Sequence, residues 1–453
     1  MSSYILPPPS GSKIIIVGAG AFGLSTAYAL SLKNKYEIWV FDRDQIPIPD
    51  AASTDISKVV RMDYGAATQN MQLMIEGLPI WKQWNKERKA KGKTPVFYKT
   101  GAVFFSQNNK YTDYSAASIK HIREAGYGHV IEELTGKDIV DRFPHFKGAV
   151  ENGYNLAYLN KEAGWCDSSE AIKHIYEKCV NNGVRFVLGP NIGCFEKLYQ
   201  QGNKVLGIQT KDQKIHYSDR VIIAAGPWTA GLIDLGDKLT ATGQIVVHFK
   251  PPASSIFSQI KNQPVWSADP GFYGFPMTSE GKLKVALHSL GYYNQRTSDG
   301  KSVPRTQVTH RNDTIPIKAL KEFREFLSKF FPQTSTMDVH YSRVCWYSDS
   351  QDSNFLVAPH PNLENIIIAS GDSGHGMKFL PVVGLKIAQI VEGLDTDYSR
   401  AWGWREVNGS SAAFDAMRAG KSVDLKPLQL EDPNNDETRM CTATDLKATI
   451  SKL

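Results

Sequence analysis

The stretch Lys13-Ile-Ile-Ile-Val-Gly18-Ala-Gly20-Ala-Phe-Gly23 decides the fold. A short apolar run ends in G-x-G-x-x-G, and residues 24–30 continue with the apolar spacing of a helix. A strand, a tight turn and a helix in this order open a dinucleotide-binding βαβ unit. Gly18 permits the turn, Gly20 lets the backbone approach a pyrophosphate, and Gly23 lets the helix pack closely on the strand. We therefore predict a nucleotide site at this turn.

The nature of the nucleotide depends on more distant segments. A second strand over residues 36–41 ends at Asp42, which is placed to accept hydrogen bonds from a ribose. These features do not distinguish NAD(P) from FAD. Near the other end of the chain, a strand over 365–370 leads into Gly371-Asp-Ser-Gly374-His-Gly376-Met-Lys378 and then into a helix over 381–392. Glycine loops at both ends of the chain favour a long ligand such as FAD over a compact NAD site.

Composition sets the class of protein. The 453 residues carry a net charge of +6, with 42% hydrophobic and 22% charged residues, which is ordinary for a globular protein with two lobes. The small positive charge argues against a nucleic-acid surface and suits an anionic cofactor and carboxylate substrates. We expect no membrane span, because the longest apolar stretch, residues 14–30, is explained by the nucleotide motif. Pro7-Pro-Pro9 would interrupt a signal peptide.

Cysteine usage and the last residues bear on location. The five cysteines are widely spaced and form no Cys/His cluster, so we expect reduced thiols and no metal site. The final residues Ser451-Lys452-Leu453 match a peroxisomal import address. They predict a peroxisomal protein whose partner is the import receptor.

Periodicity and turn signals predict the remaining elements. Lys58 and Arg61, three residues apart, could share one face of a helical turn. Asp167 and Glu170 resemble a capping box. From about residue 408 the sequence is polar and irregular, and we expect it to be partly disordered. The predicted helices span 71–88, 167–182 and 317–331, and the predicted strands span 101–106, 184–188, 205–210, 220–226, 243–249, 271–276, 282–289 and 338–347.

Residues 12–405 resemble the flavin-dependent amine oxidases that include monomeric sarcosine oxidase, pipecolate oxidase and the fungal fructosyl-amino acid oxidases (amadoriases). The most specific motifs are Arg343-Val-Cys345-Trp346-Tyr-Ser-Asp349, residues 355–361 and residues 371–381. The resemblance implies an α/β fold (α+β overall) of the glutathione-reductase/D-amino-acid-oxidase type, with a Rossmann-like FAD-binding domain interleaved with an antiparallel-sheet substrate domain. The implied ranges are 1–90, 150–235 and 340–405 for the FAD-binding domain, 91–149 and 236–339 for the substrate domain, and 406–453 for a polar tail.

The resemblance also implies how FAD is held. The cysteine that matches Cys345 is bonded in the family through its sulfur to the 8α carbon of the flavin; the alternative for Cys345 is a buried structural thiol. The implied cofactor-binding residues are Gly18, Gly20, Phe22, Gly23, Asp42, Arg43, Ser57, Lys58, Cys345, Gly374, Gly376 and Lys378.

Family positions further imply the catalytic and substrate residues. Lys284 matches a lysine beneath the flavin N5, where a fixed cation stabilises the superoxide formed as O2 takes its first electron; the alternative is a strand lysine facing water. Lys58 matches a second cation above the flavin. Arg61 and Lys378 match the residues that hold the substrate carboxylate. His288 and Tyr273 match pocket residues, although either could equally be core packing.

The implied activity is oxidation of a secondary amine on an α-amino acid to an imine, with O2 reduced to H2O2, by a monomeric enzyme. Fructosyl amino acids are the favoured substrates, with saccharopine, pipecolate and sarcosine as alternatives. Thr54 stands where sarcosine oxidases have histidine, and Tyr273-Gly-Phe-Pro276 lacks the sugar-contacting glutamate of many amadoriases. From other classes, an NAD(P)-dependent dehydrogenase and a flavin-binding protein without turnover remain as alternatives.

Overall fold

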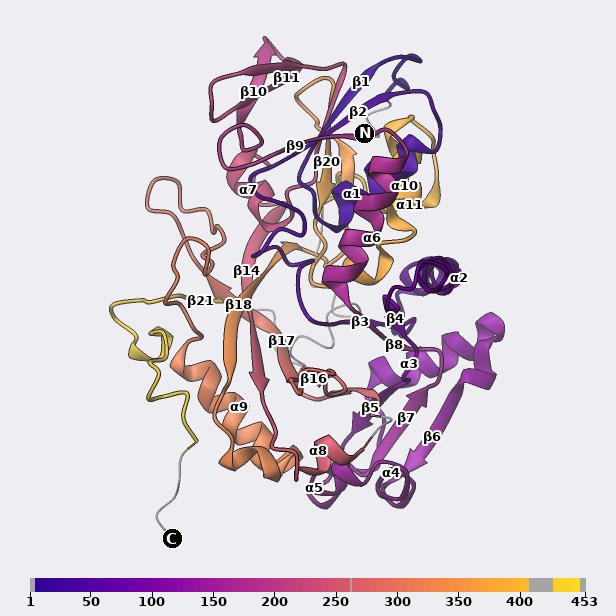
Figure 1. Ribbon diagram of the computed structural model, residues 1–453, viewed down its shortest axis with the longest axis vertical. Coiled ribbons are helices and arrows are strands. Elements are labelled where there is room, and N and C mark those ends of the chain that lie inside the picture. The colour runs from indigo at the N-terminus through magenta and orange to yellow at the C-terminus, as the bar shows by residue number, and fades with distance from the viewer. Residues whose placement is uncertain (1–4, 261–262, 407–426, 449–453) are drawn as a thin grey trace.

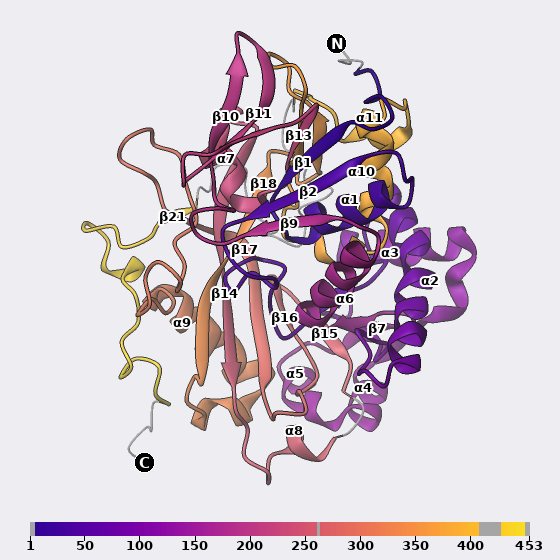
Figure 2. The same ribbon diagram turned by 45° about the horizontal axis from the view of Figure 1, so that its top comes forward.

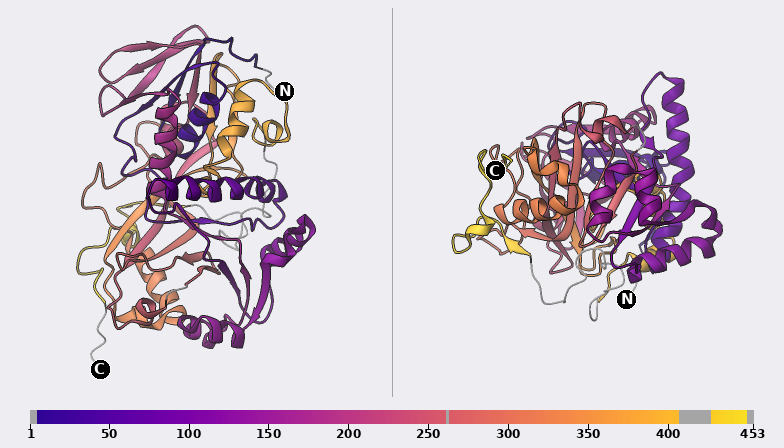
Figure 3. Two further views of the ribbon diagram at one scale, coloured as in Figure 1. Left: turned by 45° about the vertical axis from the view of Figure 1, so that its right-hand side comes forward. Right: turned by 90° about the horizontal axis from the view of Figure 1, so that it is seen from below.

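The computed structural model describes residues 5–260, 263–406 and 427–448, arranged in two lobes. The upper lobe in Figure 1 contains a six-stranded sheet with helices, and the lower lobe contains a larger sheet. The tilted view of Figure 2 shows the strands of the large sheet running from one lobe to the other. The long helix α2 (Thr68–Ala90) crosses the molecule between the lobes, as the left view of Figure 3 shows.

The six-stranded sheet is built around the opening motif, with β1 pairing in parallel with β2 and β13. Ile14 and Ile16 belong to the core shared with helices α1 and α10, whereas Ile15 and Val17 face the core beneath a small three-stranded sheet. Both faces are therefore covered, which explains the uninterrupted apolar run. The strand order is β19 (Leu356–Pro359), β20 (Ile366–Ser370), β13 (Arg220–Ile223), β1 (Lys13–Val17), β2 (Glu37–Asp42) and β9 (Arg185–Leu188), and β19 alone runs antiparallel to its neighbour.

The large sheet has nine strands and is mostly antiparallel. Helix α9 (Ile317–Phe330) covers one face, where Phe330 stacks on Trp266 with ring centroids 4.6 Å apart and Phe326 stacks on Phe272 at 4.0 Å. The order is β18 (Tyr341–Ser350), β14 (Leu239–Phe249), β17 (Leu283–Tyr293), β16 (Phe272–Gly274), β15 (Val265–Ala268), β5 (Ala102–Ser106), β7 (Leu156–Asn160) and β6 (Ile131–Thr135), with β21 (Leu428–Gln429) beside β17.

Two three-stranded sheets and shorter helices complete the described chain. The sheets are β3 (Lys58–Val60), β8 (Gly164–Cys166) and β4 (Phe97–Tyr98), and β10 (Phe195–Gln201), β11 (Lys204–Thr210) and β12 (Ile215–Tyr217). The other α-helices are α1 (Ala21–Ser31), α3 (Asp113–Ile122), α4 (Gly136–Arg142), α5 (Lys147–Glu151), α6 (Ser168–Asn181), α7 (Thr229–Leu232), α8 (Ile256–Gln259), α10 (Val383–Val391) and α11 (Asp397–Ala401). None of the helices in the described ranges combines the length and apolar character that a membrane span requires.

The predicted fold class is confirmed, but the helical turn proposed for Lys58 and Arg61 is wrong. Residues 58–60 form the extended strand β3, in which Lys58 pairs with Cys166 of β8. Sequence spacing could not reveal this pairing, because the partner strand lies about a hundred residues further along the chain. The capping box at Asp167 is half formed: the Asp167 side chain accepts from the Glu170 N–H, while the Glu170 carboxylate pairs with Arg88 and Lys173 instead.

Two strands that the predicted ranges place in the FAD-binding domain belong to the large sheet instead. Strand β7 pairs with β5 and β6, and β18 pairs with β14 along its whole length, so both belong to the large sheet. The predicted ranges 150–235 and 340–405 assign them to the FAD-binding domain. Strand β18 ends beside the six-stranded sheet, which is how one strand serves both lobes.

Part of the predicted polar tail packs on the large sheet. Residues 428–429 pair with β17, and Leu430 and Cys441 are buried. The Glu431 carboxylate also forms an ion pair with Arg305 at 2.5 Å. Packing therefore fixes a segment whose composition alone indicated little order. The predicted import address Ser451–Leu453 lies outside the described residues and stays a prediction.

Candidate functional site

A cavity of about 390 Å³ is lined by residues of both glycine segments. Gly18 and Gly20 lie along it with Asp42 and Arg43 from the end of β2. The end of β20 contributes Ser370, and the loop after it contributes Asp372, Gly374 and Gly376. The carboxyl ends of the parallel strands β1, β2 and β20 thus meet at one cavity, as expected for a nucleotide site in an open α/β sheet.

The glycine turn has little room for side chains. Gly18 has a φ of 109°, and a Cβ there would lie 2.3 Å from the Ala224 carbonyl oxygen. A Cβ on Gly23 would lie 1.8 Å from the Gly18 carbonyl oxygen, so Gly23 supports packing rather than lining the cavity. Helix α1 begins after Gly20 without a side-chain cap, which leaves its first N–H groups directed at the cavity.

The residues present fit a dinucleotide such as FAD. An Asp42 carboxylate oxygen accepts from the Ala19 N–H at 2.7 Å; burial raises the pKa of Asp42, and this hydrogen bond opposes the rise. The Arg43 guanidinium lies 4.4 Å from the Trp228 ring at the same end. The predicted cofactor residue Ser57 does not line the cavity, yet its hydroxyl is buried with no hydrogen-bond partner within the described part of the chain.

A second cavity of about 110 Å³ adjoins the first. The two share Lys58, Tyr347, Gly374 and Met377 in their linings. The structure brings four further predicted residues together around the second cavity, namely Arg61, Tyr273, His288 and Lys378. The rest of its lining is Val59, Tyr64, Ala102, Phe104, Tyr114, Val265, Trp266, Ser267, Ser373 and His375.

The second cavity is electropositive. Lys58, Arg61 and Lys378 line it, and no Asp or Glu does so among the described residues. Burial, reinforced by the nearby Arg61 charge, holds the pKa of Lys378 well below its usual range. A carboxylate bound between Arg61 and Lys378 would supply the missing negative charge and favour protonation of Lys378. The cavity is therefore suited to an anionic ligand.

Lys284 belongs to a buried cluster centred on the Asp55 carboxylate. The Lys284 Nζ donates to Asp55 Oδ2 at 2.6 Å and to the Ser57 carbonyl at 2.7 Å. Lys58 and Arg343 approach the same carboxylate oxygen at 3.4 and 3.3 Å. Burial opposes ionisation of Asp55, but the three cations hold its pKa well below the usual range.

The water-facing alternative for Lys284 is wrong, because its side chain is only 1% exposed. Burial lowers the pKa of Lys284 to about 8, against the opposing effect of Asp55. Lys284 lines neither cavity directly, whereas Lys58 lines both. The Asp55 carboxylate connects the two ammonium groups.

Cys345, in β18, lies between the two cavities. It packs with Ala52, which lines the first cavity, and with Tyr273, which lines the second. Lys58 Nζ and Arg343 Nη2 are both 3.8 Å from its sulfur.

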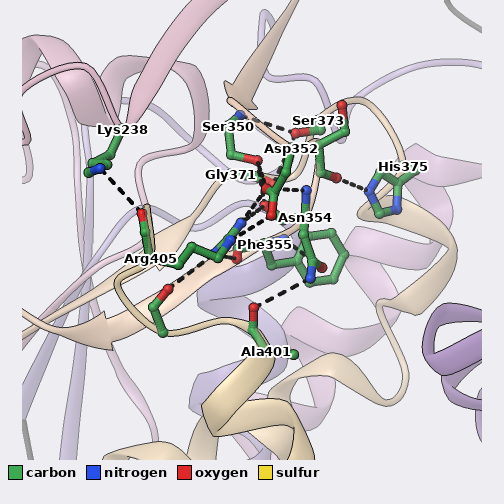
Figure 4. Close-up of polar contacts among 12 residues, drawn as sticks. Lys238, Ser350, Asp352, Asn354, Phe355, Gly371, Ser373, His375, Ala401 and Arg405 are labelled. Atoms are coloured by element: carbon green, nitrogen blue, oxygen red, sulfur yellow. Dashed lines mark hydrogen bonds and ion pairs between the residues drawn. The ribbon is translucent and has the colours of Figure 1, made fainter. Parts of the chain in front are cut away.

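Arg405 supports the glycine loop 371–378 indirectly, through the neighbouring loop that contains Asp352 and Ser353. Figure 4 shows the Arg405 guanidinium against Asp352. Its Nη2 and Nε donate to the two Asp352 carboxylate oxygens at 2.5 and 2.6 Å. Asp352 belongs to the loop between β18 and β19, in which Ser353 has a left-handed φ of 59°. The Ser353 carbonyl accepts from His375 Nε2 at 3.0 Å, so His375 Nδ1 is the acceptor for the Tyr64 hydroxyl at 3.2 Å. Arg405 thereby stabilises the loop that orients a ring of the second cavity.

Sequence reasoning missed several residues of the site. Tyr64, Tyr114, Tyr347 and His375 all line the second cavity. His375 stands inside the quoted glycine motif, and its position could have indicated a role; Tyr114 comes from a separate helix and gave no local signal. Among the residues that the structure describes, no group of three or more His, Cys, Asp or Glu side chains could hold a metal ion.

Comparison with known proteins identifies similar sequences. A family model described as FAD dependent oxidoreductase matches residues 13–390. L-saccharopine oxidase from Schizosaccharomyces pombe is 28% identical over 417 residues, which cover 88% of this chain and 94% of the relative. Peroxisomal sarcosine oxidase from Homo sapiens is 26% identical over 401 residues, covering 85% and 94% respectively.

Solved structures agree with these relatives. The crystal structure of a modified fructosyl peptide oxidase from Aspergillus nidulans, in complex with FSA, has a TM-score of 0.81 and 27% sequence identity. The match covers 94% of this chain and 99% of that chain. The similarity therefore includes both lobes and the boundary where the two cavities meet.

Proposed function

The chain belongs to the FAD-dependent oxidoreductase family, and from this premise we propose that it oxidises a secondary amine carried by an α-amino acid, with O2 as the electron acceptor. Membership of this family leaves the NAD(P)-dependent alternative without support. The observation that carries the proposal is the meeting of a dinucleotide cavity with an electropositive cavity at Lys58, Tyr347 and Gly374.

The residues of the second cavity have distinct roles in this proposal. Arg61 and Lys378 would bind the substrate carboxylate, because a guanidinium fork and an ammonium group both pair with carboxylates. Tyr273, Tyr347 and His288 would enclose the substrate and exclude water around its C–N bond. FAD, when bound, supplies the two-electron oxidation of this bond and passes the electrons to O2. The product imine is then hydrolysed by water.

We propose that Cys345 forms the covalent link to FAD, supported by its place between the cavities and by the two cations near its sulfur. Acid precipitation of the purified protein is expected to leave the yellow colour with the polypeptide. In Cys345→Ser the colour should move entirely to the supernatant, while Cys179→Ser, at a buried cysteine beside α1, should behave like the wild type. Release of free flavin from the wild type would refute the link.

The favoured substrate class from the sequence, fructosyl amino acids, stays a prediction. The lining of the second cavity favours a different secondary amine. Three basic side chains line it, and no carboxylate is present among its described lining residues to contact sugar hydroxyls. Saccharopine carries carboxylates on both sides of its secondary amine, and a saccharopine oxidase is among the relatives. We therefore propose a substrate whose N-substituent bears a second carboxylate.

A peroxide assay across saccharopine, fructosyl-valine, fructosyl-lysine, pipecolate and sarcosine tests both levels of the proposal. We expect kcat/KM to be at least about tenfold higher for saccharopine than for the fructosyl compounds, which corresponds to about 1.4 kcal/mol. Preference for a fructosyl compound would overturn the dicarboxylate assignment alone. If none of these amines gives peroxide, the proposed activity itself is contradicted.

A further inference from the structure

The Tyr114 hydroxyl connects the side chain of Arg61 to the backbone two residues later. Arg61 Nη1 donates to the Tyr114 oxygen at 2.7 Å, and the Tyr114 hydroxyl donates to the Asp63 carbonyl at 2.6 Å. Tyr114 comes from the first turn of helix α3, more than fifty residues further along the chain, and its ring lines the second cavity. One hydroxyl thus orients a guanidinium nitrogen from outside the segment that carries Arg61.

Asp63, whose carbonyl accepts the hydrogen bond from the Tyr114 hydroxyl, is fixed in position by its own side chain. The Asp63 side chain is fully buried, and its carboxylate accepts from the Tyr158 hydroxyl at 3.0 Å and from Asn160 Nδ2 at 2.9 Å. Tyr158 and Asn160 both belong to β7 of the large sheet. The backbone around Asp63 is therefore anchored to a sheet rather than to a loop.

Helix α3 is also fixed to this segment at Gly65. The Gly65 N–H donates to Ser118 Oγ at 2.8 Å, and the Gly65 carbonyl lies 2.8 Å from His121 Nδ1. Gly65 has a φ of 54°, and a Cβ there would lie 2.8 Å from the Tyr114 ring. The close approach leaves the Tyr114 ring little freedom, so its hydroxyl is a fixed point for Arg61.

We propose that Tyr114 is a positioning residue that fixes the guanidinium of Arg61 in the orientation needed to bind the substrate carboxylate. The inference rests on the proposed function, in which Arg61 binds that carboxylate. A planar fork binds a carboxylate well only when its plane is held, and fixing it before binding reduces the ordering cost. Burial raises the pKa of Tyr114, so the hydroxyl keeps its proton and can both accept from Arg61 and donate to Asp63.

The test uses Tyr114→Phe as the FAD-loaded enzyme. Oxidised enzyme is mixed anaerobically with the best substrate of the panel, and the flavin absorbance is followed over a range of substrate concentrations. This measurement separates the substrate Kd from the limiting rate of reduction. We expect the Kd to rise about 5- to 20-fold, as for loss of a hydrogen bond to a charged group, with the limiting rate within about twofold of the wild type.

The matched control is Tyr111→Phe. The Tyr111 hydroxyl donates to the Ala157 carbonyl at 3.0 Å, and Tyr111 does not line the cavity. Both variants remove one hydroxyl and leave one carbonyl without that donor, so a comparable fall in thermal stability is expected in both. Only Tyr114→Phe should change the Kd. An equal change of Kd in the two variants would show a general packing effect and overturn the inference.

A double-mutant cycle with Arg61→Met separates the inference from the proposed function. In the Arg61→Met background, Tyr114→Phe should have no further effect on the Kd. If Arg61→Met raises the Kd but Tyr114→Phe does not, the positioning role is refuted while the proposed function stands. If Arg61→Met itself leaves the Kd unchanged, the carboxylate role of Arg61 in the proposed function fails.

Discussion

Replacing Lys284 by methionine is expected to slow reoxidation of the reduced enzyme by O2 about 100- to 1000-fold, the usual effect of removing one fixed group that stabilises developing charge. Anaerobic reduction by substrate should change little. The Lys284 ammonium is the buried cation next to Asp55, and it would stabilise the negative charge that develops on oxygen. Methionine is an unbranched side chain one atom shorter than lysine, and Lys58 and Arg343 still compensate Asp55, so the fold should persist.

The control for Lys284→Met is Lys282→Met, two residues earlier. The Lys282 side chain is 31% exposed and pairs with Glu280, so this substitution should affect neither half-reaction. A parallel Lys58→Met variant distinguishes the two buried lysines. If Lys58→Met slows reoxidation and Lys284→Met does not, then the cation that lines both cavities is the oxygen-activating group, and the assignment to Lys284 is wrong.

The reoxidation rate should also depend on pH through Lys284. Burial lowers the pKa of this ammonium to about 8, so the charged form is present below that value and is lost as the pH rises through it. The rate constant for reoxidation should therefore decrease above about pH 8 in the wild type. This decrease above about pH 8 should be absent in Lys284→Met. If the decrease persists in the variant, another group is responsible for it.

Arg61→Met is expected to raise the Kd for the substrate at least about 30-fold, because truncating one partner of a buried charge pair costs about 2 kcal/mol or more. Arg61→Lys should restore only part of the affinity, since an ammonium group lacks the bidentate fork. The variant should still fold. Asp63 keeps its hydrogen bonds from Tyr158 and Asn160, and burial already raises its pKa, so it can take up a proton when Arg61 is lost.

The Kd for the Arg61 variants comes from the same anaerobic titration of flavin reduction. The control is Arg142→Met, which removes an exposed arginine of α4 that pairs with Glu132 at the surface. A fall in affinity in both variants would indicate that net positive charge, rather than a carboxylate contact, attracts the substrate. An unchanged Kd in Arg61→Met would contradict the carboxylate role.

Local sequence patterns were sufficient to predict the elements that form the nucleotide-binding half of the molecule. The strand, turn and helix over residues 13–30 and the second glycine loop at 371–378 appear in the structure as predicted. They could be predicted because their geometry depends on adjacent residues: Gly18 must adopt a positive φ, and the apolar run must be covered on both faces.

The segment around Lys58 shows where local patterns fail. Its helical reading was wrong because pairing of Lys58 with Cys166 determines the strand, and that pairing is a contact between distant parts of the chain. The sheet to which β7 and β18 belong is likewise determined by pairing with distant strands. The roles of Arg61, Lys378, His288 and Tyr273 could be proposed only through the family resemblance. The neighbourhoods of His288 and Tyr273 suit core packing equally well.

The sequence alone predicts a dinucleotide site, because a glycine turn and an acidic residue at the end of the next strand specify that site locally. The residues that line the two cavities could be identified only from the tertiary structure. It brings Arg61, Tyr114 and Lys378 from three distant segments to one cavity, and it places Lys58, Lys284 and Arg343 around the single carboxylate of Asp55. The physical reason is that charges interact through space, and the buried arrangement that gives them their strength exists only after the two lobes pack together.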